Sequence, residues 1–240
     1  MNSIQRQLNV FRQTLKEHAD AERAIQEKKY LKSPFKFFGT SLPLADDIAK
    51  GFRRSNKDAG RDYVFALAER LWSSDYHDEK RLGLRILQYY PEYIEFAMMP
   101  MLAKMLMQSS GWDFIDDISI HLVGTVLGKD KKAYAYLEKW SELDNFWMRR
   151  ASLVSQILLF RNGNGDKKLF FSFAEKMIQE KEFFIRKAIG WCLREMSKAN
   201  PDEAFDFLMK IKGRASGLTL REGAKRLSAS KKEAVLADRK

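Results

Sequence analysis

The chain has 240 residues, and 45% of them are hydrophobic, which is enough for one substantial core. Lysine and arginine number 43 against 32 for aspartate and glutamate, so the formal charge of +11 favours a polyanionic partner, with nucleic acid ahead of an acidic membrane surface. The single cysteine excludes an internal disulfide framework, and the three dispersed histidines lack metal-ligand spacing, so we expect neither a metal nor a cofactor.

Apolar residues recur at helical spacing along the chain, whereas the alternation typical of strands is almost absent. The glycine-rich segment 162–165 lies between helical segments rather than between alternating strands. The sequence therefore predicts an all-α fold. The clearest apolar stripes are Val64, Leu67, Ala68 and Leu71 on one helix, and Leu82, Leu84, Ile86 and Leu87 on another.

Capping residues predict where several helices begin. We expect one helix to start after Ser110 and another after Asn145. Asn200 precedes a first-turn proline, and Thr219 precedes a glutamate by three residues, so each predicts a further helix start. The charged segment 229–240 is expected to be either a last helix or a frayed tail, after a single domain over residues 1–228.

Four of the five tryptophans are separated by 40, 35 and 44 residues. These intervals are close to the period of HEAT-like repeats, about 40 to 47 residues, although four aromatic residues can fall so by chance. They are Trp72, Trp112, Trp147 and Trp191. We expect a curved solenoid of HEAT-like antiparallel helix pairs, because such a stack gives a basic protein a long concave face.

No familiar catalytic motif is present: the chain has no phosphate-cradling glycine loop, no nucleophile elbow and no helical zinc-protease motif. The first remaining candidate pair is Trp112 and Asp116, which share a helical face at i and i+4. An indole beside a carboxylate attracts a cation. The alternative is a buried tryptophan whose acidic neighbour faces solvent or an arginine.

Two further segments combine basic and aromatic residues. Arg149 and Arg150 point about 100° apart, so one can bind phosphate while the other turns away, although an ordinary solvated pair is the alternative. Lys187, Trp191 and Arg194 share another helical face and combine a stacking surface with two cations. Gly190 beside that tryptophan predicts close approach of another group, either a packed helix or a ligand.

These segments, in this order, resemble the AlkD family of alkylpurine DNA glycosylases. The likeness covers about residues 20 to 228, and its longest segment is also its most specific. The matching motifs are Tyr30-Leu31-Lys32-x-x-Phe35-x-Phe37-x-Gly39, Trp112-Asp113-x-x-Asp116, Asn145-x-Trp147-x-x-Arg150, Phe183-Phe184-Ile185-x-Lys187-Ala188-Ile189-Gly190-Trp191-x-Leu193-Arg194-Glu195 and Arg221-Glu222.

The resemblance implies a HEAT-like solenoid that wraps duplex DNA and excises cationic lesions of the 3-methyladenine and 7-methylguanine type. Carried over by position, Asp116 is the catalytic carboxylate, Trp112 and Trp191 are aromatic walls beside the sugar, Arg150 binds phosphate, and Tyr30 is an aromatic contact. Lys187 and Arg194 join the expected DNA-binding set. The sequence departs from the family pattern at two positions: Arg149 adds a second arginine that could bind phosphate in place of Arg150, and Gly111 stands where family members often have tryptophan.

We therefore expect a monofunctional glycosylase, without metal or cofactor, that acts as a monomer on alkylated double-stranded DNA. It has no apolar run of membrane-spanning length and no apolar core of a signal peptide near its first residues, so we expect it in the cytoplasm, with the nucleoid if bacterial. A non-catalytic helical-repeat protein that binds bent or branched DNA is the alternative, and it would not need Asp116. A protein-binding scaffold would instead predict an apolar concave face.

Overall fold

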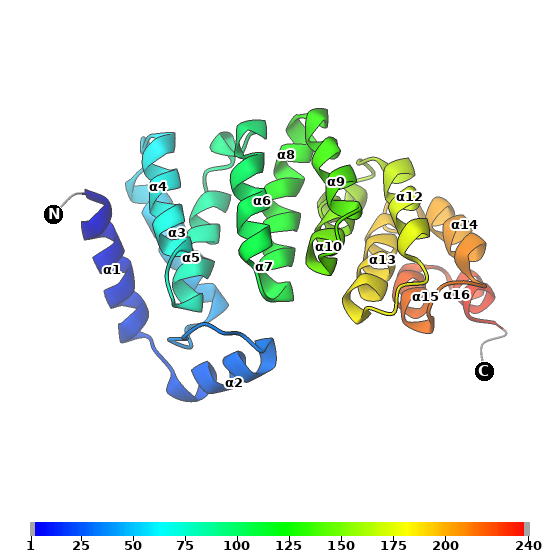
Figure 1. Cartoon of the computed structure of the whole chain (residues 1–240), viewed down its shortest axis with the longest axis horizontal. Helices are drawn as coiled ribbons and strands as arrows, with labels where there is room; N and C mark the ends of the chain where they lie inside the picture. The colour runs from blue at the N-terminus through cyan, green and yellow to red at the C-terminus, as the bar shows by residue number, and fades with distance from the viewer. Residues whose placement is uncertain (1–2, 238–240) are drawn as a thin grey trace. The chain divides into compact units, whose positions relative to one another are not determined.

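The computed structural model describes residues 3–237, and helices joined by short connections make up most of this part of the chain (Figure 1). The only extended pairing in these residues is an isolated bridge between Lys36 and Tyr76. The predicted all-α helical-repeat fold is confirmed. Met1, Asn2 and the last three residues of the segment 229–240 lie outside the described residues.

The chain divides into two compact units, one built from residues up to Glu95 with Gln108–Asp117, the other from Phe96–Met107 with residues from Ile118 onward. The helices of the first unit are α1 (Ser3–Glu17), α2 (Ala21–Leu31), α3 (Leu42–Ser55), α4 (Arg61–Trp72), α5 (His77–Gln88), the 3-10 turn η1 (Pro91–Tyr93) and α7 (Trp112–Asp117). The second unit begins with η2 (Phe96–Met98), most of α6 (Met99–Gln108), the π-helix η3 (Ile118–Val123), α8 (Gly124–Lys129), η4 (Lys131–Ala133), α9 (Tyr134–Ser141) and α10 (Phe146–Val154). It continues with α11 (Ile157–Arg161), α12 (Lys167–Met177), α13 (Phe183–Met196), α14 (Pro201–Ile211), α15 (Gly217–Gly223), η5 (Ala224–Arg226) and α16 (Ala229–Leu236).

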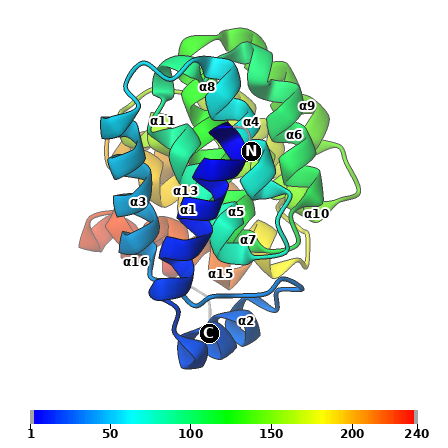
Figure 2. The ribbon, with the colours of Figure 1, turned by 90° about the vertical axis from the view of Figure 1, so that its left-hand side faces the viewer.

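The core of the first unit forms where α5 packs against α3 and α4. Both apolar stripes predicted from the sequence are buried here. Gly83 permits close approach of α5 to α4, because a Cβ atom at this position would lie 3.0 Å from the carbonyl oxygen of Ala68. Helix α1 packs beside α4 and α5, and α2 lies at one end of the unit, below α1 and α3 in both views (Figures 1 and 2).

Polar contacts hold the segment after α2 against the start of α5. The Asp78 carboxylate accepts hydrogen bonds from the backbone N–H of Phe38 and from both the N–H and the hydroxyl of Thr40, at 2.6 to 2.8 Å. Gly39 has a φ of 80°, and a Cβ atom there would lie 2.1 Å from the carbonyl oxygen of Asp20. Only glycine therefore fits this turn, which anchors the N-terminus of α2.

In the second unit α10 packs against α9 and α13, and α13 packs in turn against α11 and α15. Helix α13 is thus covered on several sides, which explains why most of its residues are buried. Its Cys192, the only cysteine of the chain, is fully buried, and its thiol donates to the carbonyl of Leu153.

The predicted helix starts can be compared with the structure one by one. Asn145 caps α10 as predicted, since its side chain accepts from the N–H of Trp147 at 2.9 Å. Helix α14 begins at the proline after Asn200, although that side chain makes no capping bond. The predicted start at Thr219 is wrong: α15 begins at Gly217 because Ser216 supplies the cap by accepting from the N–H of Thr219.

The C-terminal alternatives are also decided for the described residues. Residues from Ala229 to Leu236 form α16 with Val235 buried, so a last helix forms here. Helix α7 begins at Trp112, close to the start expected after Ser110.

Candidate functional site

Helix α7 carries the first group of expected site residues. Trp112 opens the helix and is partly exposed, whereas Asp116, one turn later on the same side, is buried with 9% of its surface exposed. The ring of Tyr30, at the end of α2, meets Trp112 edge to face with the ring centroids 6.0 Å apart. Tyr30 itself is 73% exposed. This group therefore combines a buried carboxylate with two aromatic rings that solvent or a ligand can reach.

A buried histidine supports α7 from below. Nε2 of His77 lies 2.6 Å from a carboxylate oxygen of Asp113, and the imidazole is stacked between Phe37 and Phe114 with centroids 4.4 Å from each. Arg81 approaches the other ring nitrogen at 3.3 Å. An arginine can only donate, so Nδ1 of the neutral imidazole accepts and the Nε2–H donates to Asp113.

No sequence pattern identifies His77, because its partner Asp113 lies 36 positions away and the two have no motif spacing. Phe114 also packs against Trp72, whose indole N–H donates to Gln108 at 2.9 Å. Lys80 lies over the Trp72 ring at 4.9 Å, and burial lowers the pKa of its ammonium group. Rings and polar contacts thus fix the N-terminal turn of α7 from several directions.

The three aspartates of α7 have different surroundings. Asp113 is engaged by His77, and Asp117 accepts from Gln88 at 3.1 Å and lies 3.6 Å from Arg85. Asp116 is the most buried of the three residues. These differences make Asp117 a natural internal comparison for Asp116, because it retains a cationic partner of its own.

The second group of expected residues lies in the other unit, around Arg150 of α10. This residue is 3% exposed, and its guanidinium lies 5.7 Å from the ring centroid of Phe184 and 5.9 Å from that of Trp191. Its Nη1 donates to the carbonyl oxygen of Phe184 at 2.6 Å. Trp147 packs on Phe184 with centroids 4.8 Å apart. Arg150 and Trp191 are therefore brought together, and Phe184 is a part of this cluster that the motif comparison did not single out.

Arg149 is held differently from its neighbour. Its Nε and Nη2 lie 3.0 and 2.8 Å from the two carboxylate oxygens of Glu180, and Nη1 donates to the carbonyls of Leu143 and Asp144. A two-pronged ion pair of this kind fixes the whole side chain. The contacts of Arg149 are those of a residue that ties the connection before α13 to α10.

The expected basic face of α13 also separates into distinct environments. Lys187 is exposed, with its ammonium 5.8 Å from the centroid of the Phe183 ring, whereas Arg194 makes ion pairs with Glu222 and Glu195. Gly190 lies against α15, because a Cβ atom there would lie 2.7 Å from the carbonyl oxygen of Thr219 and from a side-chain carbon of Glu222. Of the two explanations for Gly190, the packed helix is the one observed.

Comparison with known proteins supplies the family. Residues 11–227 match the family model described as "DNA alkylation repair enzyme". The chain belongs to this family. The resemblance inferred from the motifs is therefore confirmed. Membership of this family gives the protein a role in DNA alkylation repair, with DNA as its partner. No match is found among curated proteins.

Solved structures agree on the fold. A predicted DNA alkylation repair enzyme from Enterococcus faecalis superposes with a TM-score of 0.76 at 22% identity, covering 88% of this chain and 98% of that one. AlkD2 from Streptococcus mutans gives a TM-score of 0.58 at 17% identity, covering 79% and 91%. The protein smu.31 from Streptococcus mutans UA159 gives the same score and identity, covering 89% and 100%. At these identities the likeness shows the fold.

Over residues 3–237 there is no group of three histidine, cysteine, aspartate or glutamate side chains arranged to hold a metal ion. None of the helices in this range combines the length and apolar composition needed to cross a bilayer.

Proposed function

We propose that this protein is a monofunctional DNA glycosylase that removes cationic alkylated purines, of the 3-methyladenine and 7-methylguanine type, from duplex DNA. The observation that carries the proposal is the buried carboxylate of Asp116, one helical turn after the partly exposed indole of Trp112. The family role in alkylation repair supplies the class of substrate.

The chemistry follows from the charge of the lesion. An alkylated purine is already a cation, so it leaves with the electrons of the C1′–N bond and needs little help from an acid. The positive charge then develops on the sugar, where a carboxylate stabilises it, and more strongly at a site shielded from water. Asp116 has the charge and the burial for this role, and it can also orient the water that attacks C1′.

The aromatic residues and Arg150 have complementary roles in this proposal. We assign to Trp112 and Trp191 the attraction of a cationic sugar by an indole ring, and to Tyr30, which meets Trp112 edge to face, an extension of that aromatic surface. Arg150 lies beside the rings of Phe184 and Trp191, and we assign it a phosphate contact because a planar guanidinium fork suits phosphate oxygens. We assign Lys187 to the same DNA surface because it is exposed. That all these residues serve one duplex as a concave surface stays a prediction.

The product should be a free base and an intact abasic site. Strand cleavage by a bifunctional glycosylase requires an amine that forms a Schiff base with the sugar, and the proposed group is a carboxylate. We also propose that the protein acts as a monomer and without a cofactor.

The test is incubation of the protein with duplex DNA containing one 7-methylguanine, with chromatographic detection of released base. We expect base release, an uncut strand before alkaline treatment, and no covalent adduct after borohydride. Binding of the duplex without release of 7-methylguanine or 3-methyladenine would contradict the proposal and leave a non-catalytic DNA-binding role. A borohydride-trapped adduct would contradict the monofunctional mechanism.

A further inference from the structure

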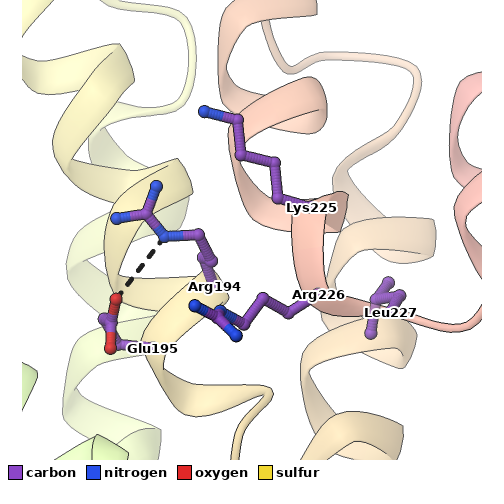
Figure 3. Close-up of a pocket in the computed structure, with 5 residues that line it drawn as sticks. All are labelled: Arg194, Glu195, Lys225, Arg226 and Leu227. Carbon is purple, nitrogen blue, oxygen red and sulfur yellow. Dashed lines mark ion pairs between the residues drawn. The ribbon is translucent and has the colours of Figure 1, made fainter.

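A polar pocket of about 480 Å³ lies in the second unit, between the C-terminal half of α13 and the turn η5 (Figure 3). Its lining combines three cations with one carboxylate and one leucine and contains no aromatic ring. The residues are Arg194, Glu195, Lys225, Arg226 and Leu227. Such a lining suits a compact anion better than a base, which would need a stacking surface.

Two buried glutamates orient the cations around this pocket. Glu222, which is 5% exposed, makes ion pairs with Arg194 and, at 2.7 Å, with Lys225. Glu195 lies 3.5 Å from Nε of Arg194, the contact dashed in Figure 3, and also pairs with Arg161 and Lys198. Around these two carboxylates there are thus four paired cations, and their side chains are held in place before any ligand arrives.

The charge state of Glu195 is set by the same contacts. Burial alone would raise the pKa of its carboxyl group, but hydrogen bonds from Lys198 and Arg161 outweigh burial and leave that pKa below its ordinary value. Glu195 therefore stays ionised at neutral pH and continues to fix the Arg194 side chain.

Arg226 brings a fifth cation without a matching carboxylate. It is exposed, and among residues 3–237 no carboxylate lies within ion-pair distance of it. Figure 3 shows its side chain extending toward Arg194. Arg194 and Arg226 both line the pocket, so an anion bound there can accept hydrogen bonds from both guanidinium groups.

We propose that Arg194, Lys225 and Arg226 form a binding site for one phosphate group of duplex DNA, separate from the cluster of Arg150 and Trp191. Arginine forks and a lysine ammonium are the donors that proteins use for phosphate, and contacts of this kind set the position of a protein on the duplex without reading its sequence. The proposal rests on the proposed function only for the identity of its ligand, duplex DNA.

The first test measures affinity for an undamaged duplex over a range of salt concentrations, for the wild type and for Arg226→Gln, Lys225→Gln and Lys176→Gln. Lys176 of α12 is the matched control, because it is exposed, pairs with Glu142 and does not line the pocket. Each pocket variant should lower the slope of log affinity against log salt by about 0.9, the value for one lost phosphate contact, whereas the control slope should stay unchanged. Equal slopes for all four proteins would overturn the proposal.

The second test locates the phosphate. Duplexes with one neutral methylphosphonate, moved along each strand, should reveal a position where the wild type loses affinity and Arg226→Gln loses no more. If every position that weakens the wild type also weakens Arg226→Gln to the same extent, Arg226 binds no phosphate and the proposal fails. Titration with inorganic phosphate, monitored by NMR chemical shifts, tests whether the pocket binds a free anion instead. Chemical-shift changes at the pocket, together with unchanged salt slopes of DNA binding in the variants, would overturn the assignment of the ligand to DNA.

Neither test depends on base excision, because both use undamaged DNA. If the protein released no alkylated base, the binding results would still decide whether the pocket holds a phosphate. If the pocket held no phosphate, the assay of base release would still test the glycosylase activity. Urea unfolding of the variants establishes that each one is folded before binding is compared.

Discussion

Nε2 of His77 lies 2.6 Å from a carboxylate oxygen of Asp113, so a histidine at the start of α5 holds the first turn of α7. The imidazole fills the space between Phe37 and Phe114, and Arg81 fixes the position of its proton. The turn that begins with Trp112 is thereby anchored on its inner side.

Replacing this histidine should destabilise the protein. His77→Ala removes a buried ring and leaves the Asp113 carboxylate without its donor, so we expect a loss of about 3 kcal/mol in the free energy of unfolding. Asp113→Asn keeps an oxygen that can accept from Nε2 and should cost less. Urea denaturation followed by circular dichroism measures both, and a His77→Ala protein as stable as the wild type would contradict the anchoring role.

The carboxylate of Asp116 should matter for chemistry rather than for binding. Asp116→Asn keeps the shape and removes the negative charge, and loss of a comparable preorganised group costs about a hundred- to thousand-fold in rate. Affinity for DNA should stay the same or rise slightly, because an anion near the phosphate backbone is removed.

Asp117→Asn is the comparison for that experiment. It changes the same charge on the same helix, and Gln88 can still donate to the remaining oxygen. Single-turnover release of 7-methylguanine should be close to that of the wild type. An equal loss in both variants, or full activity in Asp116→Asn, would remove Asp116 from the mechanism.

The two adjacent arginines should give opposite phenotypes. Arg150→Ala should weaken binding to damaged and undamaged duplex alike and lower the salt slope by about 0.9, because one phosphate contact is lost. Arg149→Ala breaks the pair with Glu180 and should lower stability while leaving the slope unchanged. Fluorescence anisotropy at several salt concentrations measures the slopes. The reverse result would transfer the phosphate contact to Arg149.

Gly190 should tolerate no side chain. Gly190→Ala places a methyl group 2.7 Å from the carbonyl oxygen of Thr219, so α15 must shift, at a cost of about 1 to 3 kcal/mol. Gly51→Ala in α3 meets nothing within 4 Å and should instead gain up to about 1 kcal/mol from helix propensity. Thermal unfolding of the two variants should therefore move in opposite directions, and a stabilised Gly190→Ala protein would contradict the close contact with α15.

Acid should weaken the contact between α1 and α5. Burial would raise the pKa of the Glu79 carboxyl group, but hydrogen bonds from Arg12 and Ser74 outweigh burial and lower that pKa below its ordinary value. The stabilisation is therefore complete above the ordinary glutamate pKa and is lost as the pH falls through the lower, folded-state pKa. When the pH is lowered from neutral to the folded-state pKa of Glu79, the free energy of unfolding measured by urea titration should fall less in Glu79→Gln than in the wild type. Asp62→Asn, on an exposed side chain, is the control.

Helical periodicity and capping residues were sufficient for the all-α fold and for most helix starts, because both depend on neighbours in the sequence. The helix start predicted at Thr219 is wrong because Ser216, three residues earlier, is the N-cap, and spacing alone does not show which of two candidate residues caps a helix. Helical spacing and caps likewise predict that the motif residues of α7, α10 and α13 lie on helices. By contrast, the Glu180 contact of Arg149 depends on packing between segments 31 residues apart, and no pattern in the chain signals it.

The buried position of Cys192 has a consequence for a protein that handles DNA exposed to alkylating agents. Electrophiles that methylate purines also react with thiols, and a cysteine on the surface would be consumed in the same medium. Here the single sulfhydryl of the chain has no exposed surface and is directed at the carbonyl of Leu153. The thiol of the folded protein is thus not accessible to methylating reagents, which therefore cannot inactivate the protein through this group.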